Sequence, residues 1–325
     1  MNGVSVIICC YNSASRLANT LQHLALQEVP VDLPWEVIIV NNASTDDTAA
    51  VALREWNRHS TRATFQVVDE PVSGLSSARS RGVAVARFEY FIFCDDDNWL
   101  ASNFVQCAFD TMTRHPQVGA ACGTGVPATE GELPVWFEKY QGGYAVGRPA
   151  EQSGDVSHLR ALTGAALVSR KTLFEKAYAI HPALLTDRKG SAMTSGGDSE
   201  YTMRLLLMGY SLYFDDRLSF THFIPSFRLT ETYRDQLFKG FRSAAPVLEL
   251  YLFQITVKFN STIDNLILLA KSMLRLVILT FMNVGRWSRE RELTWIFQLT
   301  GWYSNLVSEE CRGVRKFYKQ FRYPA

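Results

Sequence analysis

Short apolar runs alternate with stretches of helical spacing along the first third of the chain, and this alternation constrains the fold more than any other feature. It indicates an α/β fold with a mostly parallel central sheet and flanking crossover helices. In open sheets of this kind, ligands bind at the carboxyl ends of the strands. We therefore expect the functional site at that edge. The runs cover residues 4–9, 35–40, 64–68, 90–94 and 118–122.

The middle of the chain continues this pattern less regularly. Residues 125–160 are rich in Gly, Pro and aromatic side chains, which predicts a long irregular excursion. Further on, the sequence predicts a strand near Leu167–Ser169, a helix from Lys171, a Gly-rich loop at 190–197, a helix over Asp198–Met208, and two strands at Ser211–Phe214 and Leu218–Thr221. These segments complete one domain over residues 1–245.

The remaining region, residues 246–325, has a different character. From Ile263 to Val284 apolar residues recur at helical spacing, while Asp264, Lys271 and Arg275 share the opposite stripe. Three charges on one stripe favour an amphipathic helix lying in a membrane interface over one that spans it. A core or oligomer helix explains the same stripe equally well.

A basic, aromatic tail follows, and it supports the interfacial alternative. Residues 286–325 hold eight Lys or Arg against four Asp or Glu, which leaves about −3 for the rest of a chain whose net charge is +1. Aromatic residues are interleaved with these cations, as in many interfacial segments. They are Trp287, Trp295, Trp302, Tyr303, Tyr318 and Tyr323.

Composition limits the class of protein. A chain of 325 residues that is 47% hydrophobic and 20% charged can bury a full core. A net charge of +1 is too small for a general nucleic-acid binder, so we expect no nucleic-acid partner. The six cysteines include no C-x-x-C pair, and no signal-peptide pattern precedes the first apolar run. Both observations favour a cytoplasmic setting.

Three adjacent carboxylates, Asp95 to Asp97, follow the apolar run Tyr90–Cys94. They repel one another strongly unless a cation or hydrogen-bond donors offset their charge. Oxygen ligands favour Mg²⁺ or Mn²⁺, which bridge substrate phosphates. An acidic turn that caps the next helix is the alternative.

Other candidate residues are single polar groups at the ends of predicted elements. Asp198 at a predicted helix start is either a cap or a general base for an acceptor hydroxyl, with Glu200 facing the same pocket. His222 after an apolar run is either a structural histidine or a ligand of the same metal. Arg79 is either a solvated helix charge or a partner for phosphate or a base edge.

Several motifs are absent. The sequence has no G-x-x-x-x-G-K-[ST] loop and no G-x-G-x-x-G fingerprint, so phosphates are expected on a metal and not in a glycine cradle. It also lacks a nucleophile elbow and zinc-ligand spacing.

Four segments, taken in order, resemble the family 2 glycosyltransferases with the GT-A fold. They are Val4–Asn12, Val40–Asp46, Ala78–Gly82 and Asp95–Asp97. Gly197–Glu200 is similar to the family's acidic catalytic motif, and His222–Thr230 to its closing segment. The resemblance covers residues 4–230 and implies a nucleotide-binding half at 1–124 and an acceptor-binding half at 125–245.

The resemblance also implies roles for individual residues. Asp198 would be the catalytic base, and Tyr11 would stack on the nucleotide base. The donor site would comprise Cys9, Tyr11, Asn12, Asn42, Arg79, Asp95 and Asp96, and the metal site Asp97, Asp95 and His222. The sugar and acceptor pocket would comprise Trp136, Thr163, Gly164, Glu200 and Arg228.

Two positions depart from the family's pattern. Asn42 stands where many members have an Asp that contacts uracil, which leaves the nucleotide open between uridine and thymidine compounds. Gly197 stands where many have the first acid of a Glu-Asp pair, which leaves Asp198 without that neighbour.

The resemblance implies an inverting, metal-dependent enzyme. It would transfer a sugar from a nucleoside diphosphate to a hydroxyl of a lipid-linked saccharide, at the cytosolic face of a bacterial inner membrane, for surface-polysaccharide assembly, with homo-oligomers possible. Transfer to a polyprenyl phosphate is the rival within the class. An inactive membrane-bound scaffold and a sugar-nucleotide pyrophosphorylase are the alternatives outside it.

Overall fold

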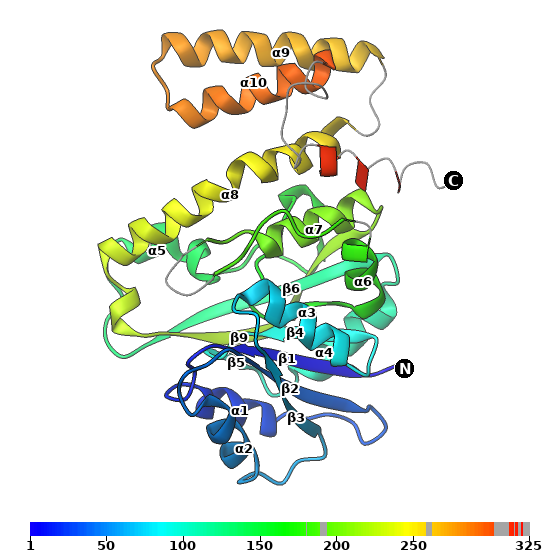
Figure 1. Ribbon diagram of the computed structural model, residues 1–325, viewed down its shortest axis with the longest axis vertical. Coiled ribbons are helices and arrows are strands. Elements are labelled where there is room, and N and C mark those ends of the chain that lie inside the picture. The colour runs from blue at the N-terminus through cyan, green and yellow to red at the C-terminus, as the bar shows by residue number, and fades with distance from the viewer. Residues whose placement is uncertain are drawn as a thin grey trace.

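A computed structural model describes residues 1–179, 181–188, 194–257, 262–301, 312–314, 316–317 and 320. The chain forms three layers, with helices on both faces of one central sheet, and two further helices stand beyond the end of this body (Figure 1). This arrangement confirms the α/β expectation.

The described residues form a nine-stranded sheet in the order β3-β2-β1-β4-β8-β6-β9-β5, with β7 paired to β9. The segment β3-β2-β1-β4 is entirely parallel. Beyond β4 the sheet is mixed, because β8 runs antiparallel to both β4 and β6 while β6 and β9 are parallel. The strands are β1 (Val4–Cys10), β2 (Trp35–Asn42), β3 (Thr64–Glu70), β4 (Tyr90–Cys94), β5 (Asn98–Leu100), β6 (Val118–Thr129), β7 (Gly154–Asp155), β8 (Leu167–Arg170) and β9 (Ser211–Ile224).

The central strands read as continuous apolar runs because helices cover both of their faces. One face packs against α1, α2 and α4, and the other against α3, α6, α7 and α8. The helices are α1 (Leu17–Ala25), α2 (Thr48–Trp56), α3 (Leu75–Val85), α4 (Phe104–Arg114), α5 (Phe137–Tyr140), α6 (Lys171–Ala179), α7 (Gly197–Leu207), α8 (Glu231–Val257), α9 (Thr262–Phe281) and α10 (Arg286–Thr300).

Strand register brings the polar chain segments to one edge. Ile8 of β1 pairs with Ile39 of β2 on one side and with Cys94 of β4 on the other. The residues that follow these three strands therefore emerge side by side, as expected for a parallel sheet.

Two expectations about strands were wrong. Residues 211–224 form a single strand, β9, where two short strands were predicted, because it pairs with β6 over most of its length across a bulge. That same pairing extends β6 to Thr129, so the first residues of the predicted irregular excursion belong to the sheet. Long-range pairing of this kind leaves no local sequence signal.

The C-terminal helices form a hairpin of α9 and α10 beyond α8 (Figure 1). The apolar stripe of α9 is exposed, which removes the core-helix alternative within the described chain. Its exposed residues are Ile263, Leu266, Ile267, Met273, Leu274, Val277, Ile278 and Phe281. None of the described helices has the length and apolarity needed to cross a membrane. Four aromatic residues of the predicted tail, Trp302, Tyr303, Tyr318 and Tyr323, lie outside the described residues.

A buried ion pair connects α7 to α8. The Glu200 carboxylate and the Arg204 guanidinium, one turn apart on α7, are 2.6 Å apart and have no exposed side-chain surface. Glu200 also accepts hydrogen bonds from the Tyr251 hydroxyl on α8, at 2.8 Å, and from the backbone N–H groups of Leu184 and Leu185. Removing one partner of such a pair leaves an uncompensated buried charge.

We therefore expect Glu200→Gln to lower the free energy of unfolding by about 3 kcal/mol or more, because the Arg204 charge would lose its counterion in the core. Chemical denaturation followed by circular dichroism measures this. The control is Glu290→Gln, which removes an exposed pair with Arg286 and should change stability by less than about 0.5 kcal/mol. Equal effects of the two substitutions would contradict the structural role given to Glu200.

Candidate active site

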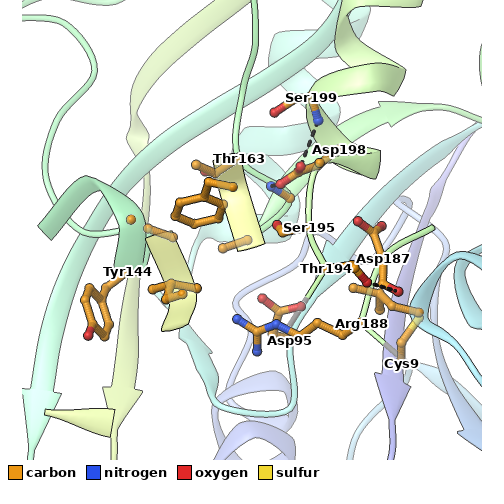
Figure 2. A pocket seen from close by; sticks show the side chains of 18 of the residues that line it. Cys9, Asp95, Tyr144, Thr163, Asp187, Arg188, Thr194, Ser195, Asp198 and Ser199 are labelled. Carbon is orange, nitrogen blue, oxygen red and sulfur yellow. Dashed lines mark hydrogen bonds between the residues drawn. The ribbon is translucent and has the colours of Figure 1, made fainter. Parts of the chain in front are cut away.

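A cavity of about 740 Å³ opens at the carboxyl ends of β1, β2 and β4. Its lower wall comes from the parallel half of the sheet and includes Asp95 and Cys9, while its upper wall comes from the turn at Thr163 and the start of α7 at Asp198 (Figure 2). One side is closed by α8, which contributes Leu237, Phe238, Phe241, Ala244 and Leu248. The cavity therefore brings together segments from both halves of the domain.

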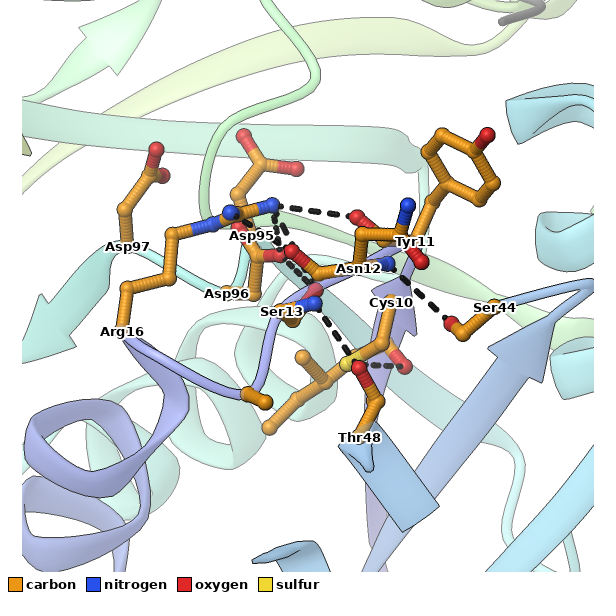
Figure 3. A network of polar contacts seen from close by, with 12 residues as sticks. Cys10, Tyr11, Asn12, Ser13, Arg16, Ser44, Thr48, Asp95, Asp96 and Asp97 are labelled. Atoms are coloured by element: carbon orange, nitrogen blue, oxygen red, sulfur yellow. Dashed lines mark hydrogen bonds and ion pairs between the residues drawn. The ribbon is translucent and has the colours of Figure 1, made fainter. Parts of the chain in front are cut away.

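The three adjacent aspartates have three different environments (Figure 3). Asp96 accepts from the Ser13 hydroxyl and pairs with Arg16, whose Nη2 lies 2.7 Å from Oδ2. Asp97 pairs with Arg228, at 2.8 Å. The Asp95 carboxylate lines the cavity and accepts no hydrogen bond from a described residue.

The titration of these groups follows from their surroundings. Burial, and then the charge of Asp97, raises the pKa of both Asp95 and Asp96. Burial acts in the same direction on Asp97, but the hydrogen bond and charge of His222 and the charge of Arg228 outweigh it and lower the pKa of Asp97. Asp96 and Asp97 thus have ion-pair partners in the described chain, whereas the Asp95 carboxylate has none there and faces the cavity, where a bound cation would offset its charge.

His222 lies beside Asp97, on β9. Its Nδ1 is 2.6 Å from the carbonyl oxygen of Tyr144, and its Nε2 is 3.5 Å from Oδ1 of Asp97. Burial opposes protonation of the ring, but the hydrogen bond and charge of Asp97 outweigh it and raise the pKa of His222. With Nδ1–H donated to a carbonyl, Nε2 is the nitrogen that remains to bind a metal.

The donor atoms at this edge suit a hard divalent ion. They are the carboxylate oxygens of Asp95 and Asp97 and the imidazole Nε2 of His222, a set compatible with Mn²⁺ or Mg²⁺. Within the described residues, no group of three or more His, Cys, Asp or Glu side chains is arranged so that it could hold a metal ion. These three residues therefore suit a divalent ion by the chemistry of their donor atoms and by their location at the same edge of the sheet.

Asp198 occupies the opposite wall of the cavity, at the first turn of α7. Its Oδ2 accepts the Gly164 N–H at 2.6 Å and its Oδ1 accepts the Ser199 N–H at 2.7 Å. Burial raises the pKa of Asp198; the nearby Arg79 charge opposes this shift, and Asp187 adds to it. A carboxylate fixed in position with a raised pKa has the properties required of a general base.

Arg79 lies between the two walls and is buried. Its Nη1 is 3.3 Å from Oδ2 of Asp187, and its guanidinium stands 5.0 Å from the ring centre of Phe93. The solvated-charge alternative is therefore wrong for this residue. Asp187 itself was missed from the sequence, because it belongs to no motif and precedes a Gly-rich loop whose residues 190–193 lie outside the described chain.

Most of the predicted site residues line this cavity. Tyr11 lies in its wall with 43% of its surface exposed. The Cys9 thiol is also in the wall, and burial raises its pKa to about 12. Asn42 is in the wall but uses its amide to hold the backbone of Glu70, Val72 and Gly74. Thr163, Gly164, Asp198, His222 and Arg228 are also in the wall.

Three predicted residues do not line the cavity. Asn12 accepts the Thr45 N–H with its side-chain oxygen and so fixes a neighbouring turn. Trp136 packs behind the wall, with its ring 6.4 Å from that of Tyr144. Glu200 lies in the core with Arg204. A helical residue two positions from Asp198 points about 200° away from it, which explains the error for Glu200.

Comparison with known proteins agrees with this geometry. The family model "Glycosyl transferase family 2" matches residues 5–176, more than half of the chain. The chain belongs to glycosyl transferase family 2. The match includes the aspartate run and ends before Asp198.

Curated relatives match over a shorter stretch. A poly-beta-1,6-N-acetyl-D-glucosamine synthase of Staphylococcus epidermidis is 27% identical over 124 residues, 38% of this chain and 28% of the relative. The putative glycosyltransferase EpsH of Bacillus subtilis is 29% identical over 103 residues, 32% of this chain and 28% of the relative. The aligned region therefore spans under a third of these relatives.

The fold extends further than the sequence similarity. The crystal structure of S. aureus TarS 1-349 in complex with UDP matches with a TM-score of 0.54 at 16% identity, covering 94% of this chain and 93% of that one. A complex of the same protein with UDP-GlcNAc matches with a TM-score of 0.54 at 15% identity, covering 98% and 89%. The similarity in fold thus extends over nearly the whole chain, the C-terminal helices included.

Proposed function

We propose that this family 2 member is an inverting glycosyltransferase that moves a sugar from a nucleoside diphosphate to an acceptor hydroxyl in polysaccharide synthesis. One observation carries the proposal: a carboxylate with the properties of a base, Asp198, and an aspartate run suited to a metal and diphosphate line the same cavity. The TarS complexes with UDP and UDP-GlcNAc favour a uridine compound as the donor, and a thymidine compound is the alternative.

Each wall has a distinct task in this reaction. The nucleotide lies along the parallel half, with its base against Tyr11 and its diphosphate toward Asp95 and Asp97. Asp95, Asp97 and His222 would hold Mn²⁺ or Mg²⁺ there, and the ion would supply charge neutralisation for the departing diphosphate. Arg79 adds a fixed positive charge beside the anomeric carbon.

Asp198 acts on the acceptor. It takes the proton of the acceptor hydroxyl as the oxygen attacks the anomeric carbon from the side opposite the leaving group, which inverts the configuration. The Gly164 and Ser199 N–H groups hold the carboxylate in place. A phosphate acceptor would need no base, so the half-buried and positioned Asp198 favours a hydroxyl acceptor over a polyprenyl phosphate.

The acceptor enters beside α8. Phe238, Phe241 and Tyr144 give this side of the cavity flat apolar faces, which pack well against sugar rings. A saccharide linked to a lipid is the acceptor we propose, since the exposed stripe of α9 continues beyond α8 and would rest on the lipid surface.

Asp198→Asn should reduce kcat by about 100-fold or more while UDP affinity stays unchanged, because it removes the base and keeps the side chain's size. In the unchanged enzyme, kcat should fall as the pH drops through the raised pKa of Asp198, at a pH above the range of an ordinary aspartate. Transfer from radiolabelled donor to saccharide and to polyprenyl-phosphate acceptors measures both effects. An Asp198→Asn enzyme with full activity would rule out the base assignment.

Asp97→Ala should abolish the gain in UDP affinity that Mn²⁺ provides, with a loss of roughly tenfold or more. Isothermal titration with UDP in Mn²⁺ or in EDTA measures this, and Asp97→Asn and thermal melting distinguish lost binding from misfolding. Asp32→Ala, at an exposed site outside the cavity, serves as the control. Equal UDP affinity of the unchanged protein in Mn²⁺ and in EDTA would refute metal dependence.

Leu266→Asp combined with Leu274→Asp should reduce flotation of the protein with anionic liposomes at least tenfold, because each buried leucine contributes roughly 2 kcal/mol. Leu53→Asp, at an exposed leucine of α2, should leave flotation unchanged. The alternative is that the exposed stripe of α9 binds a second copy of the chain. In that case the protein would not float with liposomes, and its mass in solution would show a dimer that the two α9 substitutions disrupt.

A further inference from the structure

Gly197 is the first residue of α7. Its backbone conformation is open to any residue type, but a neighbouring side chain leaves no room for a side chain at this position. Its φ angle lies outside the left-handed region, so glycine is not required by conformation. A Cβ at this position would lie 2.3 Å from Oδ2 and 2.8 Å from Cγ of Asp187. The Asp187 carboxylate therefore fills the space into which a side chain at position 197 would project.

The Asp187 carboxylate is bound on two sides. Its Oδ1 accepts the Gly197 N–H at 2.8 Å, and its Oδ2 faces Nη1 of Arg79 at 3.3 Å. Its own backbone N–H donates to the hydroxyl of Ser76, on the same helix as Arg79. One buried acid thus joins the start of α7 to α3.

Arg79 and Asp198 in turn share a contact at Gly164. A Cβ at Gly164 would lie 2.3 Å from Nη2 of Arg79 and 3.2 Å from Cβ of Asp198. The guanidinium and the base are therefore held against the same short turn. A displacement of Arg79 or of the first turn of α7 would move Asp198 relative to the cavity.

We propose that Asp187 is a positioning residue for the transfer reaction, supplying from the loop before α7 the carboxylate that Gly197 lacks. It fixes Arg79 and the Gly197 N–H, and through them the place of Asp198. This inference rests on the proposed function and explains why an active site can have glycine where the family resemblance leads us to expect an acid.

A relocation experiment tests it. Asp187→Ala should lower kcat about tenfold or more with little change in the donor KM, and Gly197→Glu alone should lower both kcat and the melting temperature, because it forces two carboxylates into one space. The double variant Asp187→Ala with Gly197→Glu should have a higher kcat than either single variant and a higher melting temperature than Gly197→Glu. Gly154→Glu, where nothing lies within 4 Å of an added Cβ, controls for a new surface charge.

A pH profile separates positioning from mere structural support. The groups that act on Asp198 are Arg79, Asp187 and the N–H donors of Gly164 and Ser199. Asp187→Asn removes a negative charge that raises the pKa of Asp198, so the acid limb of the kcat profile should move to lower pH. An unmoved limb would overturn the proposal.

Losses that simply add in the double variant, in both kcat and unfolding free energy, would also overturn it. Failure of the proposed function gives a different result, namely an unchanged enzyme that turns over no donor. In that case the unfolding free energies of the two single variants and the double variant still test the proposal. Additive losses of unfolding free energy would show that Asp187 and a side chain at position 197 do not compete for one space, and non-additive losses would support that competition.

Discussion

The concentration of negative charge at the carboxyl end of β4 is the constraint on which the rest of the site depends. Three consecutive carboxylates in a buried location are stable only where positive groups face them. Arg16 directly precedes α1, His222 belongs to β9, and Arg228 belongs to the segment after β9. The aspartate run therefore draws together elements from both ends of the domain, and the cavity forms where they meet.

A second set of buried charges organises the opposite wall. Asp187, Arg79 and Asp198 share a small volume in which each charge affects the others. Behind them, the pair of Glu200 and Arg204 ties α7 to α8 and to the loop at 184–185. The helix that presents the base is thus fixed at its first turn and again one turn further on, so its N-terminus has a defined position with respect to the sheet.

The two walls divide the chemistry between them. The parallel half presents the oxygen ligands and the exposed ring of Tyr11, which suits a nucleotide and its diphosphate. The second half presents Asp198, the proposed base, and a set of aromatic side chains. The family match covers residues 5–176 and so includes the parallel half of the sheet, whereas the wall from α8 lies outside it.

The sequence by itself determined the parallel half of the sheet, because the central strands β1, β2 and β4 are apolar on both faces and their polar ends lie next to one another in a fixed order. It also singled out the aspartate run, Tyr11, Arg79 and Asp198 as candidate site residues, since each stands in a local motif, and the structure places all of them around one cavity. Only the tertiary structure decided which carboxylates share a space. Asp187 lies ten residues from Gly197, and no local pattern records that its side chain folds back against that backbone.

The same reason accounts for the errors. Glu200 and Trp136 are residue types that are common in active sites. The helical phase of α7 directs Glu200 into the core beside Arg204, and Trp136 packs behind Tyr144 and not in the cavity. The length of β9 depends on a partner strand some ninety residues earlier. Contacts between distant segments depend on burial and strand pairing in the folded chain. A sequence pattern indicates only contacts between residues that are a few positions apart.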